Sequence, residues 1–261
     1  MINAPPPTNA WLRLHNRRAD PRVRLICFPH AGGTPTFYQS WSKRLPDWIE
    51  VISVHYPGRE ARIDEPLICE MAPLVAQVRD ALIPVVDMPF AMFGHSLGAA
   101  LAHEVARQLE CLHRVPLRLF VSGRRAPQFE RITNRYLYDD DKLWRDVCKL
   151  GGTPEQLHND LALRALVLPV LRNDYRLSET YVPTHVTPLH CPITAFVGSQ
   201  DGEVAPEHAA GWSAFSAEGF ELHVMSGGHF YLVRQWADLL RRIVERLTSA
   251  RAERQHAAAN P

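Results

Sequence analysis

The chain has 261 residues, of which 46% are hydrophobic, and this is enough to bury the core of one α/β domain. Its 29 basic and 28 acidic residues give a net charge of +1 and form no basic block interleaved with aromatic side chains, so we expect no nucleic-acid partner. No run of 18 apolar residues occurs and the amino-terminal stretch lacks the apolar core of a signal peptide, so we expect a cytoplasmic protein without a membrane span.

Apolar runs and amphipathic patterns alternate along the chain. Short apolar runs predict buried strands at residues 23–28, 51–55, 90–93, 117–121, 193–197 and 221–224. Helical spacing of apolar residues is clearest at residues 71–86, 97–109, 206–215 and 231–247. This alternation predicts an α/β fold with a mainly parallel sheet and helices on both faces. We expect one domain over residues 21–248, with flexible ends at 1–20 and 249–261.

The stretch GHSLG lies where the third predicted strand meets the following helix. Its serine, Ser96, stands between Gly94 and Gly98, which is the pattern Gly-x-Ser-x-Gly. A sharp turn from strand to helix presents the serine hydroxyl at the edge of the sheet, and side chains in place of the glycines would collide with the neighbouring strand and helix. We therefore predict that Ser96 is a nucleophile.

The segment at about 123–190 breaks the alternation, because its helical patterns have no strand between them. It is roughly twice as long as a usual crossover connection. We interpret it as a helical lid inserted into the sheet domain, in a position to cover Ser96.

A serine nucleophile needs a histidine base and an acid that orients the histidine. His229 lies on a glycine-marked turn between the last predicted strand and the last helix, and Asp201 follows the strand before it. The chain order Ser, Asp, His is that of α/β-hydrolases. We predict a Ser96–Asp201–His229 triad, with Glu203 as the second choice of acid.

Two backbone N–H groups must face the oxyanion that forms during acyl transfer. One is expected from Leu97, the residue after the nucleophile, and the other from the glycine-rich loop in FPHAGG. We choose Ala31 for the second donor, and Gly32 stays open as the alternative.

Other candidate residues receive a structural interpretation. The five cysteines are odd in number and lack paired spacing, so we expect small buried hydrophobes and neither disulfides nor a zinc site. His30, His55 and His103 are interpreted as packing or loop residues, and the His95 side chain should point away from the nucleophile.

We interpret Arg59 as a salt-bridge residue beside Glu60 and not as a phosphate ligand. The cap arginines Arg124, Arg125 and Arg131 are interpreted as a solvated charged face, with an acidic carrier domain as the alternative partner.

Five stretches, FPHAGG, YPGRE, GHSLGA, LRNDYRL and GGHF, occur in this order between about Leu25 and Phe230. Together they resemble the type II thioesterases that accompany non-ribosomal peptide and polyketide synthases. FPHAGG with YPGRE is the more specific part, since many hydrolases share GHSLG and the final GGH. Asn173, in the fourth stretch, stands where many of these relatives have a small residue.

The resemblance implies a stand-alone α/β-hydrolase, expected as a monomer, that removes acyl groups from the phosphopantetheine thiol of acyl- or peptidyl-carrier domains. By position, Ser96, Asp201 and His229 match the triad of the family, and Ala31 and Leu97 match its oxyanion donors. No metal or redox cofactor is expected. A hydrolase of acyl-coenzyme A or of small esters, and a non-catalytic scaffold, remain the alternative interpretations.

Overall fold

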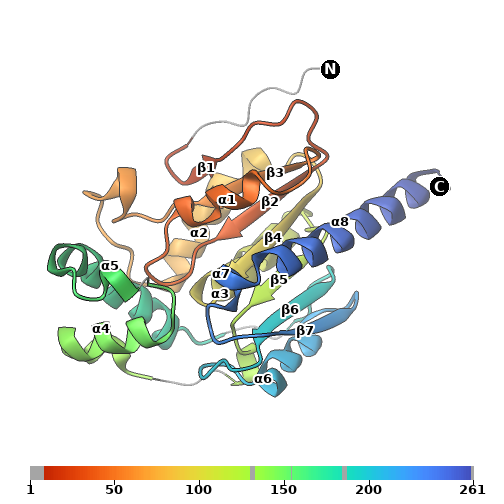
Figure 1. Ribbon diagram of the computed structural model, residues 1–261. Coiled ribbons are helices and arrows are strands. Elements are labelled where there is room, and N and C mark those ends of the chain that lie inside the picture. Colours follow the sequence, from red (N-terminus) through yellow and green to blue (C-terminus); the bar gives the residue numbers. More distant parts are fainter. Residues whose placement is uncertain (1–8, 130–132, 154, 184–186, 260–261) are drawn as a thin grey trace.

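A central sheet organises the protein, as seen in a computed structural model that describes residues 9–129, 133–153, 155–183 and 187–259 (Figure 1). Its strand order is β1-β3-β2-β4-β5-β6-β7, and β1 alone is antiparallel to its neighbour. The strands are β1 (Leu12–Leu14), β2 (Val23–Phe28), β3 (Ile49–Val54), β4 (Phe90–His95), β5 (Leu119–Ser122), β6 (Ile193–Gly198) and β7 (Phe220–Met225). The six strands predicted from apolar runs are all present. Five of them, β2 to β6, are buried along their whole length, which agrees with their mostly apolar sequences, whereas β7 is only partly buried.

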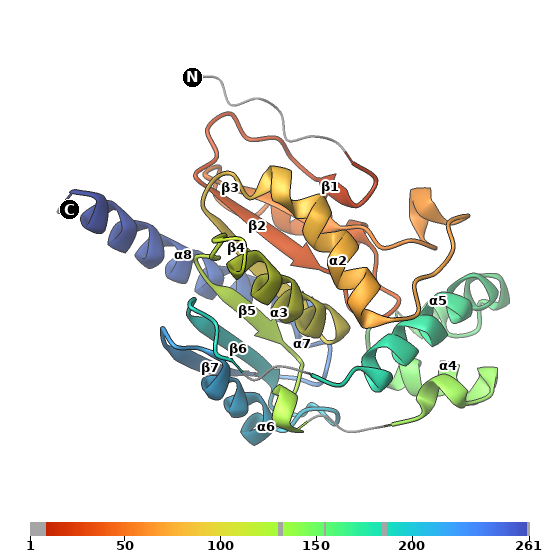
Figure 2. The same ribbon diagram turned by 180° about the vertical axis from the view of Figure 1, so that it is seen from behind.

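Helices cover both faces of the sheet, so the predicted α/β-hydrolase class is confirmed (Figures 1 and 2). One face is covered by α2 (Met71–Leu82) and α3 (Leu97–Glu110), and the other by α1 (Gln39–Ser42), α7 (Tyr231–Arg234) and α8 (Trp236–Ala259). A short helix, α6 (Pro206–Ala210), follows β6. Single 3-10 turns complete the described secondary structure: η1 (Pro35–Tyr38), η2 (Glu60–Arg62), η3 (Ile83–Val85), η4 (Pro127–Phe129), η5 (Arg135–Leu137), η6 (Glu155–Leu157) and η7 (Gly211–Phe215).

The segment between β5 and β6 holds α4 (Asp140–Lys149) and α5 (Leu161–Thr180), and no strand occurs among its described residues. Both helices begin with an aspartate that caps a backbone N–H, Asp139 for α4 and Asp160 for α5. Figure 2 shows the two helices at the end of the sheet toward which the parallel strands run. This is the end where ligand sites form in open α/β sheets.

Both segments that the sequence predicts to be flexible contain regular structure among their described residues. Residues 12–14, expected in a flexible segment, form β1, which pairs with β3 from Leu12 opposite Val54 to Leu14 opposite Ile52. Leu12 and Leu14 also pack against the hydrophobic core, but a run of three residues is too short to indicate a strand in the sequence. The expected flexible tail at 249–261 is helical through Ala259, since α8 continues past the buried Leu247 into residues that favour helices.

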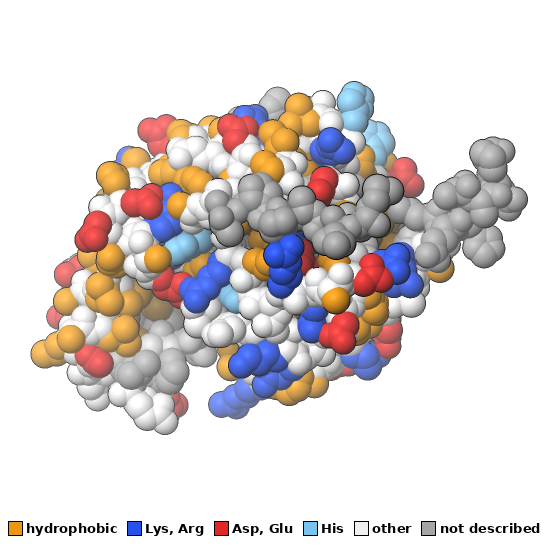
Figure 3. Space-filling view, turned by 90° about the horizontal axis from the view of Figure 1, so that it is seen from above, with side chains coloured by type: hydrophobic (Ala, Val, Ile, Leu, Met, Phe, Trp, Pro, Cys, Tyr) orange, Lys and Arg blue, Asp and Glu red, His pale blue; other side chains and the backbone are white. Residues whose placement is uncertain are grey.

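The surface viewed from above in Figure 3 carries acidic and basic side chains interspersed, and hydrophobic side chains gather on the left of the view. No helix in the described part of the chain is both long enough and apolar enough to cross a membrane.

Candidate active site

Ser96 lies on a strained turn between β4 and α3. Its backbone has φ 55° and ψ −117°, which is unfavourable for a residue with a side chain. A Cβ on Gly94 would lie 2.2 Å from the Gly98 carbonyl oxygen, and a Cβ on Gly98 would lie 2.1 Å from that of Phe28. Both flanking positions therefore require glycine, because backbone atoms occupy the space of a side chain. The turn has the form of a nucleophile elbow.

His229 and Asp201 are joined by a hydrogen bond of 2.9 Å from His229 Nδ1 to Asp201 Oδ2. The Asp201 side chain is fully buried and that of His229 is 5% exposed. Asp201 Oδ1 accepts backbone N–H bonds from Glu203 at 2.8 Å and Val204 at 3.2 Å. Because the carboxylate only accepts, Nδ1 of His229 carries the proton and Nε2 is left as the basic nitrogen.

The loops that carry these two residues are in backbone contact. A Cβ on Gly198 would lie 2.3 Å from the Gly228 carbonyl oxygen, and Gln200 donates its N–H to the Gly227 carbonyl at 2.8 Å. The acid and the base thus come from adjacent strands, β6 and β7, whose carboxyl ends meet.

Glu203, the second choice for the acid, is engaged elsewhere. Both of its carboxylate oxygens accept from the Arg135 guanidinium, at 2.8 and 3.0 Å. The geometry around His229 therefore favours Asp201 as its acid partner.

Two further histidines lie beside His229. His95 is fully buried, its ring centre is 4.9 Å from that of His229, and its Nδ1 lies 2.9 Å from Ser122 Oγ. The His95 ring therefore packs against the predicted base. Burial, together with a smaller effect of the nearby His229, lowers the pKa of His30 to about 3 and that of His95 well below its usual value. Both rings stay neutral at physiological pH, so they shape the site without adding charge.

Ala31 and Leu97 present the two candidate oxyanion amides. Leu97 is the first residue of α3, where an N–H has no acceptor within the helix. In the loop after β2, the Gly32 N–H donates to Asp174 Oδ2 at 2.8 Å and the Gly33 N–H to the His30 carbonyl at 2.8 Å. Gly32, the alternative donor, is thereby occupied, which leaves Ala31 beside Ser96 in the same cavity.

A cavity of about 210 Å³ contains Ser96 and His229, and we call it the reaction chamber. Most of its lining is polar, and much of the lining comes from the segment between β5 and β6. Its lining residues are Ala31, Ser96, Gly123, Arg124, Arg125, Thr133, Arg135, Leu150, Tyr175, Ser178, Glu179, Gly202, Glu203, Val204 and His229.

Arg124 and Arg125 belong to this lining, so their interpretation as a solvated face is wrong. Arg124 is only 8% exposed and donates to Ser178 Oγ at 2.5 Å, and Arg125 Nε donates to the Glu203 carbonyl at 2.7 Å. Arg124 is buried and Arg125 is half-buried because they contact α5 and the loop after β6, and a local charge pattern does not reveal these contacts. Arg131 lies outside the described residues.

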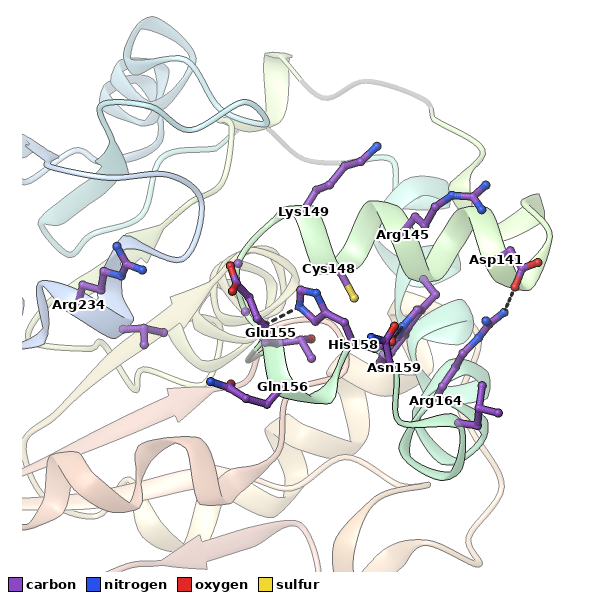
Figure 4. Close-up of a pocket in the computed structure, with 16 residues that line it drawn as sticks. Asp141, Arg145, Cys148, Lys149, Glu155, Gln156, His158, Asn159, Arg164 and Arg234 are labelled. Carbon is purple, nitrogen blue, oxygen red and sulfur yellow. Dashed lines mark hydrogen bonds and ion pairs between the residues drawn. The ribbon is translucent and has the colours of Figure 1, made fainter.

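A larger cavity of about 1190 Å³ opens between α4, η6 and α7 and holds none of the three predicted triad residues (Figure 4). Figure 4 shows Arg145, Lys149, Arg164 and Arg234 around it, with Arg164 paired to Asp141. Lys149, Gly151 and Gly152 line this cavity, while Leu150 lines the reaction chamber. The turn after α4 therefore separates the two cavities.

Replacing Gly123 with alanine is expected to displace His229. The Gly123 φ is +56°, and a Cβ there would lie 2.5 Å from His95 Cε1 and 3.2 Å from His229 Cε1. We expect a loss of about 1–2 kcal/mol of stability from the left-handed backbone, together with a fall of about a hundredfold in kcat because the base is misplaced. Gly151→Ala is the matched control: its φ is +84° but nothing lies within 4 Å. Equal kcat values for the two variants in steady-state assays would contradict the expectation.

Arg59 forms a buried salt bridge, but its partner is not Glu60. Its guanidinium binds both oxygens of Asp174 on α5, at 2.9 and 3.0 Å, while Glu60 pairs with Arg13 at 2.8 Å. Asn173 donates to the Ile68 carbonyl at 2.9 Å. Asp174 lies within LRNDYRL but could not be predicted as the partner of Arg59, because two residues 115 positions apart leave no local signal in the sequence.

All five cysteines are free. Cys27 and Cys191 are buried as expected, and burial raises the pKa of both thiols. Cys111 is exposed, so the expectation of buried cysteines does not hold for every one.

Sheet, elbow and acid–base pair together define an enzyme of the α/β-hydrolase fold. The family model described as Thioesterase domain matches residues 23–248. The chain therefore belongs to the thioesterase domain family, and it is a hydrolase.

Several proteins named as thioesterases are similar to this chain. The chain is 38% identical over 243 residues to "Thioesterase PikA5" of Streptomyces venezuelae, covering 92% of this chain and 86% of that one. It is also 38% identical over 224 residues to "Probable cadicidin biosynthesis thioesterase" of Streptomyces griseus, covering 86% of this chain but only 62% of that relative, less than two thirds of its length. Its structure is similar to that of the type II thioesterase BorB from the borrelidin biosynthetic cluster, with a TM-score of 0.87 and 37% identity over 92% of this chain and 98% of that one. The resemblance to type II thioesterases is thus confirmed.

Proposed function

We propose that the protein is a type II thioesterase that hydrolyses acyl thioesters on the phosphopantetheine arm of carrier domains in non-ribosomal peptide or polyketide biosynthesis. The observation that carries this proposal is the Asp201–His229 hydrogen bond in a chamber shared with the Ser96 elbow, in a chain of the thioesterase family. Two of the similar proteins named above are thioesterases of a biosynthetic pathway or cluster, which supports a carrier domain as the partner.

The reaction uses only groups of this chain and one water molecule. Ser96 Oγ attacks the thioester carbonyl while His229 Nε2 takes its proton, and the N–H groups of Ala31 and Leu97 bind the oxyanion. Collapse of the tetrahedral intermediate expels the pantetheine thiol, which receives its proton from His229. Water, deprotonated by the same nitrogen, then hydrolyses the acyl-serine. We propose accordingly that no metal or redox cofactor takes part.

Comparing three matched substrates tests the proposed function. Initial rates are measured with an acetylated carrier domain, acetyl-coenzyme A and a simple acetyl ester, with Ser96→Ala as the control. We expect the carrier to be preferred and all turnover to be lost in the variant. Equal or faster turnover of the free substrates would identify a general hydrolase, and no turnover of any substrate would favour a scaffold.

The reaction chamber predicts a preference for short acyl groups. Its volume of about 210 Å³ is below the roughly 300–1,000 Å³ of usual ligand pockets, and its arginine and glutamate lining offers little apolar surface to a long chain. On one carrier domain we expect kcat/KM for an octanoyl group to be at least about tenfold below that for acetyl, because one methylene alone can change kcat/KM by that factor. Butyryl should fall between them. A faster reaction with octanoyl than with acetyl would refute the preference.

A further inference from the structure

Three of the sequence stretches that are distant along the chain meet at one carboxylate. Asp174, in LRNDYRL, accepts the N–H of Gly32, in FPHAGG, at 2.8 Å with Oδ2. The same oxygen accepts from Nη1 of Arg59, in YPGRE, at 2.9 Å, and Oδ1 accepts from Nη2 at 3.0 Å. The helical segment between β5 and β6 is thereby bound to the loop that carries the Ala31 amide.

Arg59 also holds this loop directly. Its Nη1 donates to the Gly33 carbonyl at 3.0 Å, and the Gly33 N–H donates to the His30 carbonyl at 2.8 Å. The His30 carbonyl and the Ala31 N–H belong to one planar peptide unit, in which they point in opposite directions. Fixing the carbonyl therefore fixes the direction of the amide that we assign to the oxyanion.

The face of α5 that carries Asp174 also packs on this loop. Leu171, three residues earlier on the same face of the helix, lies so close that a Cβ on Gly32 would be 2.6 Å from its Cδ2. Gly32 has φ +71°, which glycine adopts without strain. Helix and loop are thus fitted to each other by shape as well as by hydrogen bonds.

The ion pair between Arg59 and Asp174 is buried, and a buried ion pair fixes the geometry of its two partners more than it adds to the stability of a fold. Asp174 is 1% exposed and Arg59 is 5% exposed. Apolar residues of similar volume often stabilise a protein as well as a buried ion pair does, so such a pair is most useful where it fixes one geometry. Here it fixes the loop beside the nucleophile.

We propose that Asp174 is a positioning residue for the thioesterase reaction: from α5 it holds the loop 29–33, with Arg59, so that the Ala31 N–H points at the oxyanion. The proposal rests on the proposed function, because an oxyanion forms at this place only if Ser96 attacks an acyl group. The reaction would then require α5 in the position seen here.

The test compares Asp174→Asn with Glu50→Gln. Glu50 forms the other deeply buried ion pair described, with Arg24 at 3.0 Å, at side-chain exposures of 2% and 4% and away from the lining of the reaction chamber. For each variant one measures the unfolding midpoint, kcat and KM on an acetylated carrier domain, and inhibition by an alkylboronic acid. The boronic acid forms a tetrahedral adduct with a serine and so reports on the oxyanion site.

We expect both variants to lower the unfolding midpoint. Only Asp174→Asn should lower kcat, by about a hundredfold as for the loss of one oxyanion donor, with KM little changed and boronate affinity lowered by a similar factor. The proposal would be overturned if kcat fell in both variants in proportion to the fall of the unfolding midpoint. It would also be overturned if Asp174→Asn bound the boronic acid with unchanged affinity.

A second variant keeps the proposal testable if Asp174→Asn does not fold. Arg59→Lys retains a positive charge near Asp174 but cannot bind both its oxygens and the Gly33 carbonyl in one plane, so we expect a smaller loss of kcat, about tenfold. Unchanged kcat and boronate affinity in a folded Arg59→Lys protein would overturn it. If the unmodified enzyme fails to hydrolyse any acylated carrier, the proposed function fails, while the boronate comparison still decides whether Asp174 positions the loop.

Discussion

Replacing Ser96 with alanine is expected to lower kcat on an acylated carrier domain by about a millionfold, to the level left when a whole triad is removed. The physical reason is that no other nucleophile is placed at the elbow, so the acyl-serine intermediate cannot form. Ser96 is a partly exposed turn residue with φ 55°, and alanine retains its Cβ, so we expect the unfolding midpoint to change little.

Mass spectrometry provides the decisive measurement. A rapid-quench sample of the unmodified enzyme should show an acyl adduct on the peptide that contains Ser96, and the variant should show none. An adduct on another residue, or a variant with more than about one thousandth of the original kcat, would contradict the assignment of Ser96 as nucleophile.

Asp201→Asn is expected to lower kcat by about ten-thousandfold, as in serine enzymes whose triad aspartate becomes asparagine. Asp201 Oδ1 accepts two backbone N–H groups, from Glu203 and Val204. The asparagine oxygen must remain there, so its NH₂ group faces Nδ1 of His229. That nitrogen must then accept, the proton moves to Nε2, and the base can no longer take the proton of Ser96.

Glu203→Gln is the matched variant for this acid, since it makes the same chemical change two residues away. It weakens the pair with Arg135 at the wall of the reaction chamber, and we expect only about a tenfold loss of kcat from this disturbance. Nuclear magnetic resonance of the imidazole nitrogens should show a proton on Nδ1 in Glu203→Gln and on Nε2 in Asp201→Asn. The reverse order of the two kcat losses would assign the acid to Glu203.

Much of this fold could be predicted because its signals are local. The runs that form β2 and β6 are mostly apolar, and the elbow at Ser96 joins a buried strand to an amphipathic helix within a few residues. β1 could not be predicted because its three residues are too few to establish the alternation of apolar and polar residues that indicates a strand.

In the candidate site, too, the residues with local sequence signals could be predicted, and those that depend on distant contacts could not. Ser96, Asp201 and His229 could be proposed because each follows a recognisable strand, in the order that the fold requires. Arg59 was assigned its neighbour Glu60, because a sequence displays adjacent charges and not those that folding brings together. Likewise the sequence indicated that Arg124 and Arg125 are surface charges, because it does not display their contacts with α5 and with the loop after β6.

The contact of Asp174 with the loop 29–33 couples α5 to the oxyanion site in both directions. If the position of α5 affects binding at the oxyanion site, then binding at that site must affect the position of α5. Linkage requires that any charge bound at the Ala31 amide stabilise the docked position of α5 by the same factor by which docking strengthens the binding of that charge. The helix would therefore be held most firmly during the two tetrahedral stages of a turnover and least firmly once the acid product has left. Slow hydrogen exchange in α5 of a boronate adduct, compared with the free enzyme, would be the equilibrium signature of that cycle.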